Sequence, residues 1–343
     1  MAKPILVIKF GTASITRPTG EPDLAIIAEV ARQVSLLHKD YRLIIVSSGA
    51  VGAGKAFIQE YKGTITQRKA AASVGNPLLV GLYASHFTPY GIAIAQSLCE
   101  RQHFANRHQF LQLKETYDEL WNNGIIPIVN ENDVVSDREL KFSDNDELAT
   151  LIAAGFGAEA LMLCTSVGGL LDEAGQLVRE VPDVNEVFKF VKTGKSALGL
   201  GGMASKLTFA KLATRMGIRV VIFGMGEKDG ILRALQGSTG TVFSPQASTL
   251  SARKRWLGSG GLVAGKLRID DGAAKALVKR KSLLAVGVLE VVGEFEAGEI
   301  IELFTPENEM IAVARARETS RAILNNLKTQ NFEVANASDI VLL

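Results

Sequence analysis

Cysteine is scarce in this chain, whose 343 residues include only Cys99 and Cys164, each inside an apolar run. A disulfide framework and a cysteine-based zinc site are therefore not indicated, and a reducing cytoplasm is the expected compartment. The four histidines also lack the spacing of metal ligands, so we expect no metal held by protein side chains. No apolar run approaches the ~18 residues of a membrane-spanning helix, and the first one is too short for a signal peptide. Export and membrane insertion are not expected.

An excess of one charge is also missing, because 38 Lys and Arg residues balance 36 Asp and Glu residues and leave a net charge of +2. The chain therefore has no general attraction for a polyanion, and any phosphate has to be bound by a local site. Proline is sparse at nine residues, whereas the 33 glycines are abundant and clustered. Clustered glycines suggest backbone held close to something other than protein.

Short β-branched runs alternate with longer helical stretches up to about residue 245. The runs predict strands buried on both faces at residues 5–9, 42–47, 92–98, 125–129, 161–164 and 220–223. Helical spacing predicts helices at 24–37, with Asp23 as cap, and at 147–154 and 207–216. The alternation predicts an α/β fold with a mainly parallel sheet sandwiched by helices, whose ligands lie beyond the carboxyl ends of the strands.

The sequence changes character after residue 245. Residues 246–261 are polar, rich in serine and glycine, and carry one basic cluster next to Trp256, which predicts a linker. Residues 262–343 combine one short helical segment with short strands and glycine turns. We therefore expect a second, small β-rich domain, and we look for chemistry in residues 1–245.

Two glycine-containing turns follow the first two predicted strands. Lys9 ends a buried strand next to Gly11, where an ammonium group and backbone N–H groups could meet a phosphate; a lysine that reaches solvent is the alternative. Residues 49–55 match the G-x-x-x-x-G-K pattern of a P-loop, but Ala56 lacks the hydroxyl that would bind magnesium. We interpret this segment, with Gly49, Gly52 and Gly54, as an anion-binding loop of another kind; a tight turn packed on a neighbour is the alternative.

Three further polar segments exceed what turns and caps require. Residues 130–133 (NEND) follow a strand and favour a ligand with an amine or hydroxyls. Residues 143–146 (SDND) open a helix, where one acid would suffice as a cap and a second could orient lysines or magnesium. Residues 199–206 (GLGGMASK) place glycines and a lysine before another helix, which suits a phosphate cover or a mobile loop.

The order of these segments resembles the amino acid kinase superfamily, and within it the glutamate 5-kinase family. The stretches that carry the resemblance are VIKFGTASI, IVSSGAVGAG, PIVNENDVV, FSDNDELA and GLGGMASK, within residues 5–245. The segments RKRW and GKLRIDDGAAKAL are similar to that family's domain boundary and C-terminal PUA domain. The resemblance implies a catalytic domain over residues 1–245, a linker over 246–261 and a PUA-like domain over 262–343.

The resemblance implies transfer of the γ-phosphoryl group of ATP to the side-chain carboxylate of L-glutamate, the first step of proline synthesis. It assigns catalysis to Lys9, Lys206, Asp146, Gly11 and Gly49, with Asp146 organising the two lysines. It assigns substrate binding to Ser48, Asp133 and Asn145, with Asp133 suited to the α-ammonium and the other two to carboxylates. It assigns ATP binding to Lys9, Thr165, Ser166, Gly201, Gly202, Met203 and Lys206, with Mg²⁺ held mainly by the phosphates. Ser166 departs from the family, which usually has aspartate there.

The implied partners are L-glutamate, ATP, proline as a feedback inhibitor that overlaps the glutamate pocket, and further copies in a homo-oligomer. Two alternatives stay open. One is a related kinase for N-acetylglutamate, carbamate or a nucleoside monophosphate, although an acid at Asp133 favours a free α-ammonium. The other is an RNA-binding PUA protein with an inactive kinase domain. Two features argue against RNA binding: the near-neutral charge, and the segment IAVARARETS, which lacks the glycine that the family typically has after the Ile-Ala pair.

Overall fold

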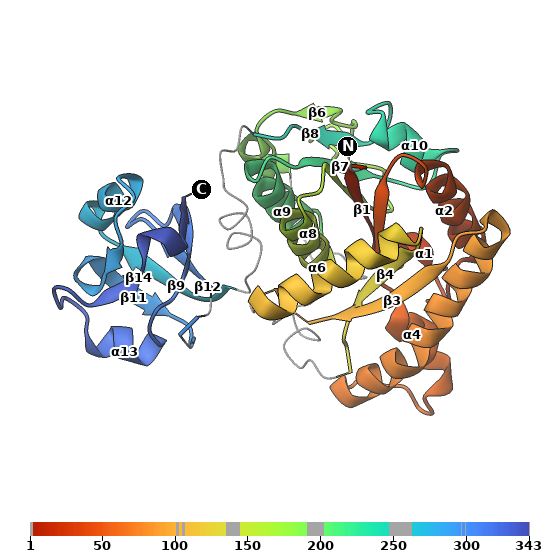
Figure 1. The fold of residues 1–343 in the computed structure, drawn as a ribbon. Coiled ribbons are helices and arrows are strands. Elements are labelled where there is room, and N and C mark those ends of the chain that lie inside the picture. The colour runs from red at the N-terminus through yellow and green to blue at the C-terminus, as the bar shows by residue number, and fades with distance from the viewer. Residues whose placement is uncertain are drawn as a thin grey trace. The chain divides into compact units, whose positions relative to one another are not determined.

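The computed structural model describes residues 3–100, 103–104, 107–134, 145–190, 202–246, 263–295, 297–298 and 300–342. The chain divides into two compact units, Met1–Glu100 with Lys114–Ala247 and Arg101–Leu113 with Ser248–Leu343 (Figure 1). The predicted linker lies outside the described residues apart from Gln246, so the predicted domain boundaries stay a prediction. Within the described part of the chain, no helix is long and apolar enough to cross a membrane.

The first unit is built on an eight-stranded sheet with the order β3-β4-β2-β1-β5-β7-β8-β6. Its strands are β1 (Ile5–Phe10), β2 (Arg42–Ser47), β3 (Ile94–Cys99), β4 (Ile126–Glu131), β5 (Ala160–Cys164), β6 (Glu180–Val181), β7 (Arg219–Phe223) and β8 (Thr241–Phe243). From β3 to β7 all neighbours are parallel, whereas β8 runs antiparallel to β7 and β6 is parallel to β8. The six predicted strands are confirmed; β6 and β8 are too short to have given a sequence signal.

Helices cover both faces of this sheet, as predicted for an α/β fold (Figure 1). One core is formed by α2 (Leu24–Leu37), α4 (Ile65–Phe87) and α10 (Gly230–Leu235), which pack on alternate strand residues such as Leu6, Ile8 and Phe10. On the other face, α8 (Asn145–Phe156) packs on β1, β5 and α9 (Met203–Arg215). The Phe156 ring of α8 stacks on Tyr117 of α6 (Arg107–Asn122) at 4.9 Å between centroids.

The helix boundaries follow local capping chemistry. The Asp23 carboxylate accepts the N–H groups of Ala25 and Ile26 at 3.0 and 3.3 Å, which starts α2 at the predicted residue. Helices α8 and α9 begin at Asn145 and Met203, earlier than the predicted 147 and 207. The earlier start places Asp146 and Lys206 in the first turns of their helices, where both take part in the site described below.

Short helical segments complete the two units. They are α1 (Thr12–Ile15) and α3 (Ala50–Gly54), with the 3₁₀ segments Lys55–Phe57, Thr88–Tyr90, Val184–Phe190, Ala285–Gly287 and Ala337–Asp339. Both cysteines are free and buried. Burial raises the pKa of the Cys164 thiol to about 12, so this side chain is an uncharged core residue at neutral pH.

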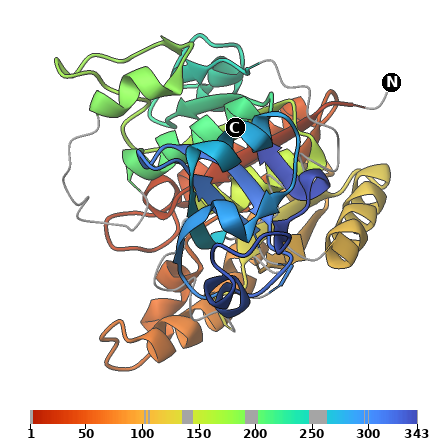
Figure 2. The same ribbon diagram turned by 90° about the vertical axis from the view of Figure 1, so that its left-hand side faces the viewer.

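The second unit is β-rich, as predicted, and Figure 2 shows its strands in blue. A five-stranded sheet has the order β11-β9-β12-β13-β15, and β10 pairs with β14. Its elements are β9 (Val263–Ile269), α12 (Asp271–Val278), β10 (Leu283–Leu284), β11 (Val288–Val292), β12 (Ile300–Phe304), β13 (Met310–Arg315), α13 (Ser320–Asn325), β14 (Glu333–Ala335) and β15 (Ile340–Leu342). Its own core includes Leu267, Ile269, Ile301, Leu303 and Ile323, so it is stabilised independently of the first sheet.

Candidate active site

Strand alternation directs Lys9 toward the face that carries α8. Successive side chains of a strand point to opposite faces, and Ile8 and Phe10 belong to the core formed with α2, α4 and α10. Lys9 therefore points to the other face, near the carboxyl end of β1. Its side chain is only 5% exposed, which requires a partner because an unpaired buried ammonium is costly.

The partner of Lys9 is Asp146 in the first turn of α8. The Lys9 Nζ atom lies 2.5 Å from Asp146 Oδ1, and Lys206 Nζ lies 2.8 Å from Asp146 Oδ2. The Asp146 side chain is fully buried, and that of Lys206 is 8% exposed. Burial alone would raise the pKa of Asp146, but the two ammonium groups outweigh it and lower the pKa from 3.8. Asp146 is therefore a carboxylate at neutral pH and holds both lysines in place.

This lysine–aspartate cluster (Lys9, Asp146, Lys206) carries a net positive charge at the carboxyl end of the central strand. The sheet order reverses at β1, with β2 on one side and β5 on the other, and ligands of open α/β sheets bind at such a point. Two ammonium groups fixed around one carboxylate are preorganised to stabilise an anion whose charge grows during a reaction. The cluster is thus suited to a phosphoryl group in transfer.

The predicted glycines 11 and 49 lie at the carboxyl ends of β1 and β2. A Cβ atom on Gly11 would lie 3.6 Å from Lys9 Nζ, so the Gly11 backbone adjoins the ammonium group. Gly49 precedes α3 with a φ of 104°, a left-handed conformation that favours glycine. Both positions let backbone approach a ligand closely; their roles in catalysis stay predictions.

The glycines at 52 and 54 serve packing instead. A Cβ atom on Gly54 would lie 1.9 Å from the Ala71 carbonyl oxygen of α4, and one on Gly52 would lie 2.5 Å from the Gly20 carbonyl oxygen. Lys55 donates to the Thr19 carbonyl at 2.5 Å. The P-loop-like segment thus contains a short helix, Ala50–Gly54, whose glycines pack closely on their neighbours, as the alternative of a packed turn predicts. Anion binding by residues 49–55, which would involve the backbone at Gly49, stays a prediction.

A second polar cluster joins the carboxyl ends of β2 and β4. Asn145 Nδ2 donates to Ser48 Oγ at 2.6 Å and to Asn130 Oδ1 at 3.1 Å. Asn130 Nδ2 in turn donates to Asn76 Oδ1 of α4 at 2.9 Å. We call Asn76, Asn130 and Asn145 the amide chain. It begins next to Asp146 and leads away from the lysine–aspartate cluster toward α4.

The structure thus brings the predicted substrate residues Ser48 and Asn145 into contact with each other. The third, Asp133, is half-buried just beyond β4, and its contact with an α-ammonium stays a prediction. The sequence did not single out Asn76, which is 4% exposed on α4. A possible signal was an asparagine next to Pro77 in helical sequence, since both residues disfavour a helix interior.

The predicted nucleotide residues lie on the other side of β1. Thr165 directly follows β5, its backbone N–H donates to the Phe223 carbonyl at 2.7 Å, and Ser166 is exposed. Gly202 precedes α9, and Met203 is its first residue. Gly201 lies outside the described residues.

The polar groups therefore follow the sheet order from β4 through β2 and β1 to β5. This edge is roughly 14 Å long, since neighbouring strands lie ~4.8 Å apart. An edge of that length accommodates a small acceptor beside the terminal phosphate of a nucleoside triphosphate.

Comparisons with known proteins identify the family of this chain. The model of the amino acid kinase family matches residues 4–224, and the PUA domain model matches residues 265–329. The glutamate 5-kinase of Gloeobacter violaceus is 41% identical over 312 residues, which are 87% of this chain and 85% of that protein. The glutamate 5-kinase of Sodalis glossinidius is 38% identical over 331 residues, which are 93% of this chain and 90% of that protein.

A more distant relative supports the fold. The glutamate 5-kinase of Thermoanaerobacter sp. is 32% identical over 343 residues, covering 96% of this chain and 92% of that protein. Among solved structures, carbamate kinase from Giardia lamblia bound to AMP-PNP matches with a TM-score of 0.53 at 18% identity, over 71% of this chain and 99% of that one. At such identity the structural match concerns the fold alone.

Proposed function

This chain belongs to the amino acid kinase family and, within it, to the glutamate 5-kinases, and from this premise we propose how it performs their reaction. The enzyme transfers the γ-phosphoryl group of ATP to the side-chain carboxylate of L-glutamate. The product is glutamate 5-phosphate, an acyl phosphate formed in the first step of proline synthesis.

The lysine–aspartate cluster is the observation that carries the catalytic part of the proposal. In phosphoryl transfer, negative charge spreads over the transferring group, and catalysis consists mostly of positioning and charge stabilisation. Lys9 and Lys206 supply two positive charges that Asp146 holds at fixed positions. Backbone N–H groups at Gly11 and Gly49 would add hydrogen bonds to the oxygens of the transferring group. Thr165, Ser166, Gly202 and Met203 lie on the side where we place ATP.

The glutamate site lies on the opposite side of β1, at Ser48, Asn145 and Asp133. The glutamate side-chain carboxylate has to approach the lysine–aspartate cluster, because it attacks the phosphoryl group there. The α-amino and α-carboxylate groups then extend toward the end of β4. A free α-ammonium is best matched by an acid, which favours Asp133 as its partner and glutamate over N-acetylglutamate.

Magnesium fits this site only when it is bound through the phosphates of the nucleotide. The Asp146 carboxylate is engaged by two ammonium groups, so it is a poor ligand for a cation. Among the described residues, no group of three or more His, Cys, Asp or Glu could hold a metal. Mg²⁺ would therefore bind chiefly through ATP phosphates and water, as this ion usually does, and would neutralise phosphate charge there.

We extend the proposal to regulation and assembly by analogy with the family. Proline shares the α-carboxylate and amine of glutamate, so it would compete at the same end of the site. We place the enzyme in the cytoplasm as a homo-oligomer.

The direct test is acyl phosphate formation by the full chain, trapped as the hydroxamate. ATP, Mg²⁺ and glutamate together should give hydroxamate, and omission of ATP or glutamate should abolish it. N-acetylglutamate, carbamate and a nucleoside monophosphate serve as competing acceptors. Turnover of N-acetylglutamate without turnover of glutamate would overturn the choice of substrate.

A further inference from the structure

One backbone N–H group sets the orientation of the whole amide chain. The Glu131 N–H donates to Asn130 Oδ1 at 2.9 Å, and a backbone N–H can only be a donor. Asn130 must therefore present its oxygen to Glu131 and its Nδ2 to Asn76. Asn76 accepts with its own Oδ1, and Asn145 donates to the oxygen of Asn130 with its Nδ2. The alternative flips of these amides would place donor against donor or acceptor against acceptor.

This orientation leaves a donor at one end of the chain and an acceptor at the other. Among the residues that the structure describes, Asn76 Nδ2 and Asn145 Oδ1 are buried without a hydrogen-bond partner. Asn76 as a whole is 96% buried, since its exposed fraction is 4%. An unsatisfied buried donor costs about 1–3 kcal/mol, so a purely structural Asn76 would be an unfavourable choice at this position.

The free donor and the free acceptor match the two ends of an α-amino acid. An α-carboxylate accepts hydrogen bonds and an α-ammonium donates them. The Asn145 end of the chain adjoins Asp146, whereas Asn76 lies two amide contacts farther away on α4. The two α-groups of glutamate share one carbon atom far from the side-chain carboxylate, and of these two only the α-carboxylate accepts hydrogen bonds, so it is the group that meets the donor of Asn76.

We propose that Asn76 is a substrate-binding residue whose Nδ2 donates to the α-carboxylate of bound glutamate. Asn145 Oδ1 then accepts one hydrogen of the α-ammonium, in place of the carboxylate contact that the resemblance implied, and the other hydrogens stay available for Asp133. This inference rests on the proposed function and deepens it. It assigns the carboxylate contact to Asn76, and it makes Asn145 an acceptor because both hydrogens of its Nδ2 are already used. Asn130 connects the two residues and fixes their orientation.

The test uses Asn76→Asp, which keeps the oxygen that Asn130 needs and replaces only the free donor. The readout is the ratio of kcat/KM for L-glutamate to kcat/KM for L-isoglutamine, in which a carboxamide replaces the α-carboxylate. We expect this ratio to fall about tenfold or more, because the introduced carboxylate repels the α-carboxylate and accepts from the carboxamide. The same enzyme sample gives both values, so a partly unfolded preparation does not change the ratio.

Two further variants separate binding from folding. Asn76→Leu removes the donor without adding charge, and it should also lower the ratio. It therefore keeps the proposal testable should the aspartate variant fail to fold. Gln33→Leu is the matched control, because Gln33 is fully buried and accepts the Ile231 N–H at 2.8 Å in a purely structural contact. This control should lower the melting temperature and leave the ratio unchanged.

The outcomes distinguish this inference from the proposed function. A wild-type enzyme that forms no acyl phosphate from glutamate would overturn both. If the wild-type enzyme forms acyl phosphate, but the ratio in Asn76→Asp and Asn76→Leu lies within about twofold of the wild-type ratio, the Asn76 contact alone is overturned. A fall of the ratio in the Asn76 variants but not in Gln33→Leu is the predicted result.

Discussion

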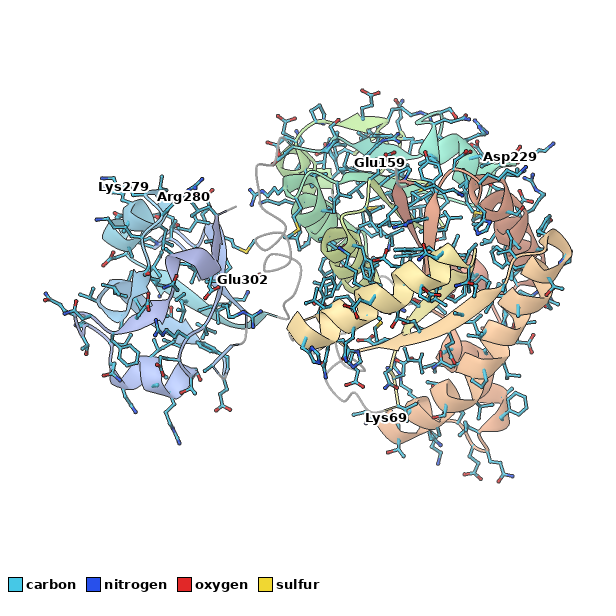
Figure 3. All side chains as sticks on the ribbon, viewed as in Figure 1. Lys69, Glu159, Asp229, Lys279, Arg280 and Glu302 are labelled. Atoms are coloured by element: carbon cyan, nitrogen blue, oxygen red, sulfur yellow. The ribbon has the colours of Figure 1, made fainter. Side chains whose placement is uncertain are left out.

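The two units of this chain place their charged groups differently. The first unit buries Lys9, Asp146 and Lys206 at the carboxyl ends of its strands. In the second unit, the Arg268–Glu290 pair lies on the surface, with side chains 44% and 47% exposed. Lys279 and Arg280 after α12 are also exposed, and Glu302 of β12, which pairs with Lys266, has a side chain 20% exposed (Figure 3). The buried polar or charged residue recorded in the described part of residues 263–342 is Ser320.

This difference indicates where function constrains the sequence. Burying charges costs several kcal/mol per ion, and an apolar replacement is often neutral or stabilising. An exposed ion pair contributes only about 0–1 kcal/mol to stability, and its charged groups remain largely hydrated. The buried cluster of the first unit is therefore better explained by chemistry than by stability, whereas the exposed Arg268–Glu290 pair of the second unit needs no such explanation. The following predictions test this contrast, from the largest expected effect to the smallest.

The largest effect is expected for Lys9→Ala. Loss of one preorganised charge contact to the transferring phosphoryl group should lower turnover by about 10²- to 10³-fold. Hydroxamate formation at saturating substrates measures this, and circular dichroism checks the fold. The control is Lys266→Ala in the second unit, a side chain 55% exposed, which should keep near-native turnover. Equal turnover of both variants would remove the distinction between the units.

A smaller but still large effect concerns stability. Asp146→Asn leaves Lys9 and Lys206 without their shared carboxylate. We expect the free energy of unfolding to fall by about 3–5 kcal/mol, as for other buried pairs that lose one partner. Urea denaturation measures the loss, and ATP should restore part of it because the phosphates supply negative charge. A loss below about 1 kcal/mol would mean that the lysines rearrange freely.

The difference in free energy of unfolding between wild type and Asp146→Asn should depend on pH. The pKa of Asp146 is lower in the folded chain than the ordinary 3.8, because the two lysines outweigh burial. Such a group stabilises the fold above the unfolded pKa, and the stabilisation is lost as the pH falls through the folded pKa. The stability difference between wild type and Asp146→Asn should therefore be full at neutral pH and shrink below about 3.8. A constant difference over this range would contradict the pairing.

The smallest effect is expected in the second unit. Arg268→Ala removes an exposed ion pair with Glu290 and should change the free energy of unfolding by less than about 1 kcal/mol. Turnover should not change. A loss of several kcal/mol in urea denaturation would show that this surface pair matters as much as the buried cluster.

Much of the fold could be predicted because its signals are local. The helix α2 follows from apolar spacing and the Asp23 cap, and the long strands follow from continuous apolar runs. The sequence order of Lys9, Asp146 and Lys206 pointed to one site through the resemblance to a family. Their contacts depend on the sheet order around β1, which alternation of strands and helices does not determine.

The remaining features depend on contacts between distant segments. The role of Gly54 becomes clear only from its approach to α4, where a side chain would collide with the Ala71 carbonyl. Asn76 was missed for the same reason, since its partner Asn130 lies 54 residues away. The G-x-x-x-x-G-K pattern of residues 49–55 likewise gave no indication that Ala50–Gly54 forms a short helix packed on α4.

The central claim is that the site has two parts, an amide chain with Ser48 that binds glutamate and a lysine–aspartate cluster that transfers the phosphoryl group. The most direct measurement is steady-state kinetics of Ser48→Ala and Lys206→Ala under the same conditions. Ser48→Ala should raise KM for glutamate about tenfold with kcat little changed, whereas Lys206→Ala should lower kcat about 10²-fold or more with KM for glutamate little changed. If both variants change the same parameter to the same extent, the division of the site into these two parts is wrong.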